Sequence, residues 1–153
     1  MKRIEVKLAV HVVAPLLDLI KGMADSLRSE LASPYAPSGL DPEFDAVWSG
    51  ELLTAQCVDL QVLLGLFNEE FFADGVIALD EDNAEQIVRA TAAVRLRLRS
   101  QYLGVLGDET LETGNVELEG LEEPLRKAFM CYLFLATIQE LNIQHMDGII
   151  LDA

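Results

Sequence analysis

The sequence predicts a mainly α-helical protein, a bundle of about five helices in which two central helices are apolar. A minor two- or three-stranded sheet from the termini completes the predicted fold. Apolar residues recur at intervals of three and four along most of the chain, which is the period of a helix. The segments 51–73 and 124–146 are apolar on nearly every side, and such helices are usually enclosed by protein. With 153 residues, the chain is expected to form one domain, residues 1–153.

The first part of the chain is expected to hold a strand, a helix and a loop. Residues 4–8 alternate apolar and charged side chains, the period-two pattern of a half-buried strand. Pro15 is expected in the first turn of a helix that runs to about residue 31, because a proline there loses no hydrogen bond. The Ser, Pro and Gly residues of 33–39 predict a loop.

Two helices are expected in the middle of the chain. Asp41 followed by Pro42 predicts a capped short helix, and Gly50 is expected to break or bend it. The apolar helix over 51–73 follows and is expected to stop at Gly75.

A short extended piece, a helix and an acidic loop are expected next. The extended piece covers 76–79, and the carboxylates after it suit the start of a helix that reaches about residue 103. Residues 108–123 contain seven acids and no base, which predicts a solvated loop.

The last helix is expected to start at Pro124 and to continue to about residue 146, where Gly148 would end it. The apolar residues 149–151 are then expected to add a strand beside residues 4–8.

The charge distribution excludes several classes of partner. The chain has 26 acids against 11 Lys and Arg, a formal net charge of −15, and thirteen of the acids lie between Arg28 and Arg89, where no base occurs. Such a surface repels the phosphates of nucleic acids and of anionic lipids. No apolar run reaches the about 18 residues of a membrane span. We therefore expect neither a nucleic acid nor a membrane as a partner.

The residues that usually carry catalysis or bind metal form no recognisable motif. Cys57 and Cys131 are too few and too far apart for a disulfide framework or a zinc site, and we expect free thiols in a reducing, cytoplasmic compartment. Neither His11 nor His145 follows a Glu by three residues, as di-metal helical bundles require. We expect no metal site, no cofactor and no enzymatic activity.

The one concentration of basic residues is the helix that ends near residue 103, with Arg89, Arg95, Arg97 and Arg99. At 100° per residue, Arg95 and Arg99 fall between two apolar stripes and are expected to be half buried. Half-buried arginines need carboxylate partners, and Asp59 and Glu140 are the candidates on the two most apolar helices. Two interpretations stay open: structural ion pairs, or a pocket that recognises a carboxylate or a phosphate.

A surplus of apolar residues indicates an interface between subunits. Hydrophobic residues make up 51% of a very acidic chain, and apolar surface of this kind is often hidden in a homodimer. Six aromatic side chains are expected in the core or in the interface: Trp48, Phe67, Phe71, Phe72, Phe129 and Phe134.

The stretch 76–107, VIALDEDNAEQIVRATAAVRLRLRSQYLGVLG, combines an apolar segment, Leu-Asp, a helix with an Arg-Leu-x-Leu core and a closing Leu-Gly. Together with Tyr132 and Gln139-Glu140, and with the pair Asp-Pro near residue 41, it resembles a helical domain family of unknown function known mainly from actinobacteria. The resemblance implies a mostly helical fold without an established activity. It also implies a gene that is often near that of the ClpS proteolytic adaptor, and some members carry the label of transcriptional regulator.

Three classes of function follow from these observations. The first, which we favour, is a non-enzymatic protein-interaction or assembly module that forms a homodimer. The second is a helical bundle that binds a small anion or a divalent metal through Arg95, Arg99, Asp59 and Glu140. The third is a transcriptional regulator, which the net charge disfavours.

Overall fold

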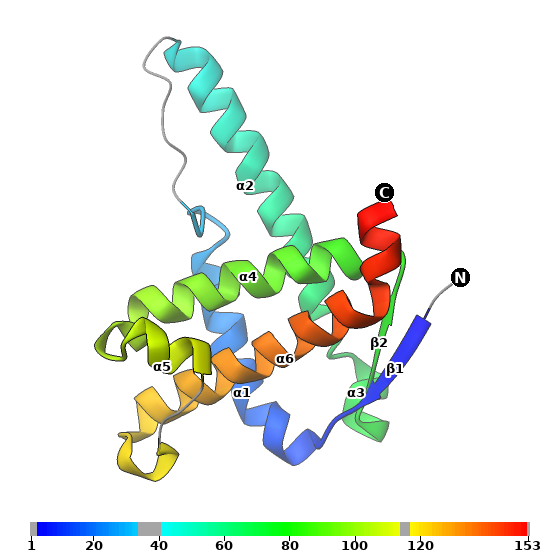
Figure 1. The fold of residues 1–153 in the computed structure, drawn as a ribbon. Coiled ribbons are helices and arrows are strands. Elements are labelled where there is room, and N and C mark those ends of the chain that lie inside the picture. Colours follow the sequence, from blue (N-terminus) through cyan, green and yellow to red (C-terminus); the bar gives the residue numbers. More distant parts are fainter. Residues whose placement is uncertain (1–2, 34–40, 114–116, 153) are drawn as a thin grey trace.

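The computed structural model describes residues 3–33, 41–113 and 117–152, and it confirms a mainly α-helical fold with a small sheet (Figure 1). In chain order the elements are β1 (Arg3–Lys7), α1 (Val10–Ser26), α2 (Pro42–Leu64), α3 (Glu69–Asp74), β2 (Val76–Asp80), α4 (Ala84–Gln101), the 3₁₀ turn η1 (Leu103–Val105), α5 (Asp108–Thr113), the 3₁₀ turn η2 (Leu118–Gly120) and α6 (Glu123–Asp152).

The core lies between α1, α4 and α6, which cross the body of the molecule next to one another (Figure 1). Helix α6 presents one continuous stripe to this core, because its buried residues recur at intervals of three and four. The stripe consists of Ala128, Phe129, Cys131, Tyr132, Leu135, Ile138 and Asn142. The prediction that the last apolar helix lies in the core is confirmed for this stripe, but the expected enclosure on all sides is wrong, because Thr137, Glu140 and Ile143 are exposed.

The sheet pairs β1 with β2 in antiparallel register, from Arg3 opposite Asp80 to Lys7 opposite Val76. Both strands were expected, but the predicted third strand at 149–151 is wrong, since these residues continue α6. Gly148 therefore does not end the helix.

The turn into β2 depends on Gly75, which ends α3 in the left-handed conformation with φ of 75°. Its carbonyl accepts a hydrogen bond of 2.6 Å from the N–H of Leu8, and a Cβ at this position would collide with the Leu8 carbonyl. Only glycine tolerates both constraints. The stop predicted at Gly75 is confirmed.

Helix α1 begins at Val10, five residues before the expected start, so Pro15 lies inside the helix. The helix starts early because the strand before it ends at Lys7, where the N–H of Leu8 is already bonded to Gly75. The side chain of Pro15 is exposed, and the proline removes the hydrogen bond that its N–H would give to the carbonyl of His11.

Helix α2 is continuous where two helices were predicted. Asp41 caps it as expected, since its carboxylate accepts hydrogen bonds from the N–H groups of Glu43 and Phe44. Gly50 does not interrupt the helix: a Cβ there would meet nothing within 4 Å, so no neighbour forces a bend. The helix ends at Leu64, and α3 then forms a separate short helix.

The prediction that 51–73 is an enclosed central helix is wrong. The first half of α2 projects away from the body, and only Asp59, Leu60 and Leu63 of this helix are buried (Figure 1). Among the described residues, one segment, Pro42–Asp74, is long and apolar enough to cross a membrane by length and composition, and 28% of its most apolar window is buried within the protein. Core helices of soluble proteins pass the same test but are mostly buried, and one such segment alone is weak evidence for a membrane span.

The acidic stretch 108–123 is partly helical instead of a plain loop, because it contains α5 and η2. Leu111 of α5 is 4% exposed and anchors this stretch to the core. The guanidinium of Arg126 donates hydrogen bonds to the carbonyls of Leu118 and Leu121, both at 2.9 Å, and so fixes η2 at the start of α6.

Candidate functional site

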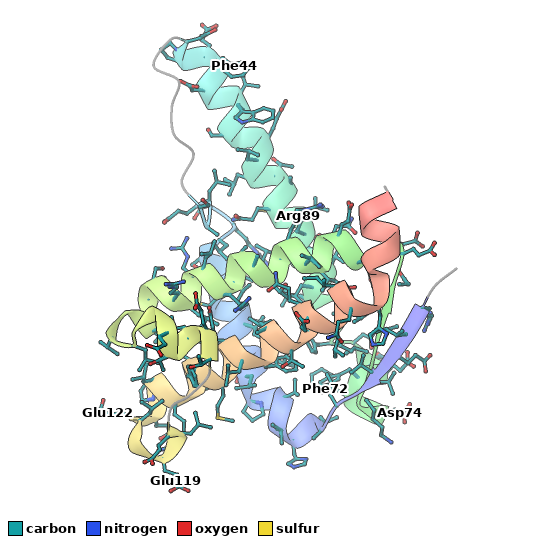
Figure 2. The ribbon with its side chains drawn as sticks, viewed as in Figure 1. Phe44, Phe72, Asp74, Arg89, Glu119 and Glu122 are labelled. Carbon is teal, nitrogen blue, oxygen red and sulfur yellow. The ribbon has the colours of Figure 1, made fainter. Side chains whose placement is uncertain are left out.

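A cluster of exposed apolar side chains lies on the first turns of α2, residues 42–51, which we call the arm. Phe44 is 55% exposed, Val47 61% and Trp48 42%. The rings of Phe44 and Trp48 stack almost parallel, with centroids 6.4 Å apart. Figure 2 shows Phe44 near the free end of the helix, far from the body. Three large apolar side chains on one projecting helix are a typical interaction surface.

A groove of about 450 Å³ opens at the base of the arm, between α2, α4 and the chain that follows α1. Its apolar lining consists mainly of Leu31, Leu52, Ala55, Ala92, Ala93 and Leu96. The small side chains of α4 leave the hollow open beside α2. Asp59 and Arg89 supply charged groups to the same lining.

Asp59 and Arg89 form a bidentate ion pair that joins α2 to α4. Arg89 Nε lies 2.9 Å from one carboxylate oxygen of Asp59, and Nη2 lies 3.0 Å from the other. The hydrogen bond to Asp59 raises the pKa of Arg89 above its ordinary value. The Asp59 side chain is 9% exposed, whereas that of Arg89 is 56% exposed and also lies 3.6 Å from Glu85 (Figure 2). The pair therefore orients α2 at the edge of the groove.

The predicted partner of Asp59 was Arg95 or Arg99, and the structure pairs Asp59 with Arg89 instead. The reason is the direction of each side chain: Arg89 lies on the face of α4 that meets α2, whereas Arg95 lies on the face that meets α6. Ala92 and Ala93, one turn after Arg89, could have identified the face of α4 that meets α2, because small residues allow close contact between helices.

Arg95 lies between α4 and α6, where two neutral groups hold it. Its Nη1 donates a hydrogen bond of 2.7 Å to Gln139 Oε1, and its guanidinium carbon lies 4.4 Å from the centre of the Tyr132 ring. Stacking of this kind stabilises a guanidinium without a carboxylate. The predicted partner Glu140 is exposed and accepts a hydrogen bond from Gln144.

Arg99 is half-buried in the last turn of α4, as expected, and its predicted pairing stays a prediction. Arg97, for which no burial was predicted, is enclosed: its side chain is 11% exposed and pairs with Glu30 at 3.2 Å. Three arginines of α4 thus hold α2, α6 and the chain after α1 in place.

Gln56 fixes the wall of the groove that follows α1. Its amide nitrogen donates to the carbonyls of Leu27, at 2.7 Å, and Glu30, at 3.0 Å, while its oxygen accepts from the N–H of Ala32 at 3.0 Å. The nitrogen and the oxygen of the Gln56 amide therefore both bind the backbone of residues 27–32, which belong to no helix or strand.

The two cysteines are free thiols in different surroundings. Cys131 is fully buried, and desolvation raises the pKa of its thiol to about 12. Cys57 is half-buried on α2, with its sulfur 3.5 Å from the carbonyl of Arg28. In the part of the chain that the structure describes, no three His, Cys, Asp or Glu side chains gather as a metal site would require.

The family model of a domain of unknown function, DUF2017, matches residues 2–146 of the chain. The chain belongs to this family. The expected relationship to a helical family of unknown function is therefore confirmed at that level. No curated protein and no solved structure shows significant similarity to the chain.

Three residues on which the resemblance to a helical family rested meet in the structure of this DUF2017 member. Arg95 of the Arg-Leu-x-Leu core contacts both Tyr132 and Gln139 of α6. They form a connection between two core helices rather than an open cavity, and this geometry favours a structural role for them.

Proposed function

We propose that the protein is a non-enzymatic assembly module that forms a homodimer through the arm of α2. The single observation that carries this proposal is the projection of Phe44, Val47 and Trp48 from the body on one helix. Exposing such side chains to water is unfavourable by roughly 25 cal/mol for each Å² of apolar surface. A partner that covers them recovers this free energy, and aromatic residues are frequent anchors of interfaces.

The other two classes of function have less support. An anion pocket would need arginines that are available to a ligand, whereas Arg95 is occupied by Gln139 and Tyr132. A transcriptional regulator would need a basic face, and the formal net charge is −15. The free thiols of Cys57 and Cys131 are compatible with the cytoplasmic location that we propose. An actinobacterial origin and a gene beside that of the ClpS adaptor stay predictions of the resemblance.

The proposal also favours a protein partner over a lipid one for α2. Asp59 stands within the apolar segment and is paired with Arg89, while Leu60 and Leu63 lie in the core. Moving α2 into a bilayer would break this pair and uncover these residues, which costs several kcal/mol for the charges alone.

Light scattering of the full chain tests the proposal. We expect the wild type to have twice the monomer mass in the micromolar range, and Phe44→Glu to weaken the dimer about tenfold or more. Val105→Glu is the matched control, because Val105 is 80% exposed but lies outside the arm and the groove.

The single tryptophan gives a second readout. Trp48 is the only tryptophan of the chain, so its emission should shift to shorter wavelength as concentration rises. A wild type that stays monomeric, with Trp48 emission independent of concentration, would contradict the proposed homodimer.

A further inference from the structure

We propose that the groove beside α2 is the seat for the arm of a second copy, so that the two chains dimerise by reciprocal exchange of their arms. This inference rests on the homodimer proposed above. It adds the receiving surface, namely the lining formed by Leu31, Leu52 and Ala55 together with Ala92, Ala93 and Leu96 of α4.

The chemistry of the groove matches that of the arm. The arm presents two stacked aromatic rings, and the groove presents aliphatic side chains around a hollow of about 450 Å³. This volume is within the roughly 300–1,000 Å³ of pockets that enclose drug-sized molecules. Leu96 is 46% exposed at the groove, so the described residues leave part of the receiving surface open to solvent, as they do for the arm.

The positions of arm and groove suit a twofold symmetric contact. Trp48 lies one turn before Leu52 and two turns before Ala55, so the aromatic face of the arm continues directly into the groove wall. When two copies of α2 cross in opposite directions near Glu51, Trp48 of each copy comes opposite Thr54 and Ala55 of the other, and the exposed Glu51 side chains turn away from the axis into solvent. Each arm then lies at the groove of the other copy, and one twofold axis relates the two contacts, as an isologous dimer requires.

The charges of the two helices are complementary. Helix α2 carries four carboxylates and no base. Of the α4 arginines, Arg95 contacts α6 and Arg97 is paired with Glu30, so the charge offered to a second copy is that of Arg89, which Asp59 holds in place. Arg89, with a side chain 56% exposed, lies in the groove lining, where the acidic arm of the second copy would approach. Two chains with a formal net charge of −15 repel one another in general, so contact is favoured where opposite charges face each other.

Disulfide trapping between two differently tagged preparations tests the exchange. One preparation carries Phe44→Cys and the other carries Ala92→Cys or Leu96→Cys, each in a Cys57→Ser background that removes the half-buried native thiol. Cys131 is left in place because it is fully buried. After mild oxidation of the mixed dimer, we expect a disulfide between residue 44 of one chain and residue 92 or 96 of the other.

The alternative results separate this inference from the homodimer itself. A disulfide between the two Phe44→Cys chains as the main product would show that the arms lie tip to tip, which overturns the exchange but keeps the dimer. A dimer by light scattering that gives no trapped product at either groove position also overturns it. A monomer that sediments with phosphatidylglycerol vesicles would overturn both proposals and assign the arm to lipid.

A substitution in the groove gives an independent test without disulfide chemistry. Leu96→Glu changes an exposed side chain, so the monomer is expected to keep its melting temperature. We expect the dimer dissociation constant to rise about tenfold or more, as for Phe44→Glu in the arm. An unchanged dissociation constant would overturn the groove as the seat.

Discussion

Helices α2 and α6 are both rich in apolar residues, yet the described part of the chain buries a long stripe of α6 and leaves the first half of α2 uncovered. The stripe of α6 from Ala128 to Asn142 is buried against α1 and α4. Of the 23 residues of α2, only Asp59, Leu60 and Leu63 are buried. Apolar composition on all sides of a helix therefore shows that it needs a cover. It does not show whether that cover is the same chain.

The attachment of the two helices to the body explains the difference. Helix α6 contacts two long helices along most of its length, whereas α2 contacts α4 near its second half and then extends beyond it (Figure 1). The arm lies past the point where the body ends, so no other described element reaches Phe44 or Val47.

The largest expected difference between α2 and α6 is in the reactivity of their cysteines. Cys57 of α2 is half-buried, whereas Cys131 of α6 is buried. At pH 8, a thiol reagent should label Cys57 of the folded protein at least about 10³ times faster than Cys131, whose labelling requires opening of the core. A colorimetric disulfide reagent measures both rates. Cys57→Ser should lose the fast phase, and two fast thiols in the wild type would contradict a stably buried α6.

Truncation of one aromatic residue on each helix should separate core from interface. Phe129→Ala removes a fully buried ring and is expected to cost about 3–5 kcal/mol of unfolding free energy. Trp48→Ala should change it by less than about 0.5 kcal/mol when the protein is dilute enough to be monomeric. Urea unfolding measures both values. Equal losses would mean that the arm packs against its own chain in solution.

The junction between arm and body depends on the Asp59–Arg89 pair, and its removal should have a smaller effect. Asp59→Ala is expected to cost about 1–3 kcal/mol, because it removes two charged hydrogen bonds from a buried position. Asp59→Leu should cost less, since an apolar side chain there can join Leu60 and Leu63 while the exposed Arg89 turns to solvent. Urea unfolding measures the loss of unfolding free energy in both variants. Equal losses would mean that an apolar side chain cannot replace the ion pair.

Local chemistry allowed much of the fold to be predicted from the sequence. The alternation of residues 4–8, the cap at Asp41 and the stop at Gly75 each depend on a few neighbouring residues, and each is confirmed. The place of α6 in the core also follows from its apolar composition, whereas its burial along one stripe alone was not predicted. These features need no knowledge of distant contacts.

Three of the wrong predictions depend on tertiary contacts. Residues 149–151 have strand-like composition, but β2 is the partner that β1 finds once Gly75 brings the two strands together. The partner of Asp59 depends on which face of α4 meets α2, and periodicity alone does not specify this. The exposure of the arm depends on the length of the body beneath it, which is a property of the assembled fold.

The amide of Gln56 limits how this acidic sequence can vary. Exchange of glutamine for glutamate is a small step in a chain that already carries 26 acids. At position 56, however, a carboxylate would set its negative oxygens against the carbonyls of Leu27 and Glu30, which now receive two N–H groups. The exposed polar positions of α2 can therefore accept a further negative charge, whereas position 56 must keep an uncharged donor.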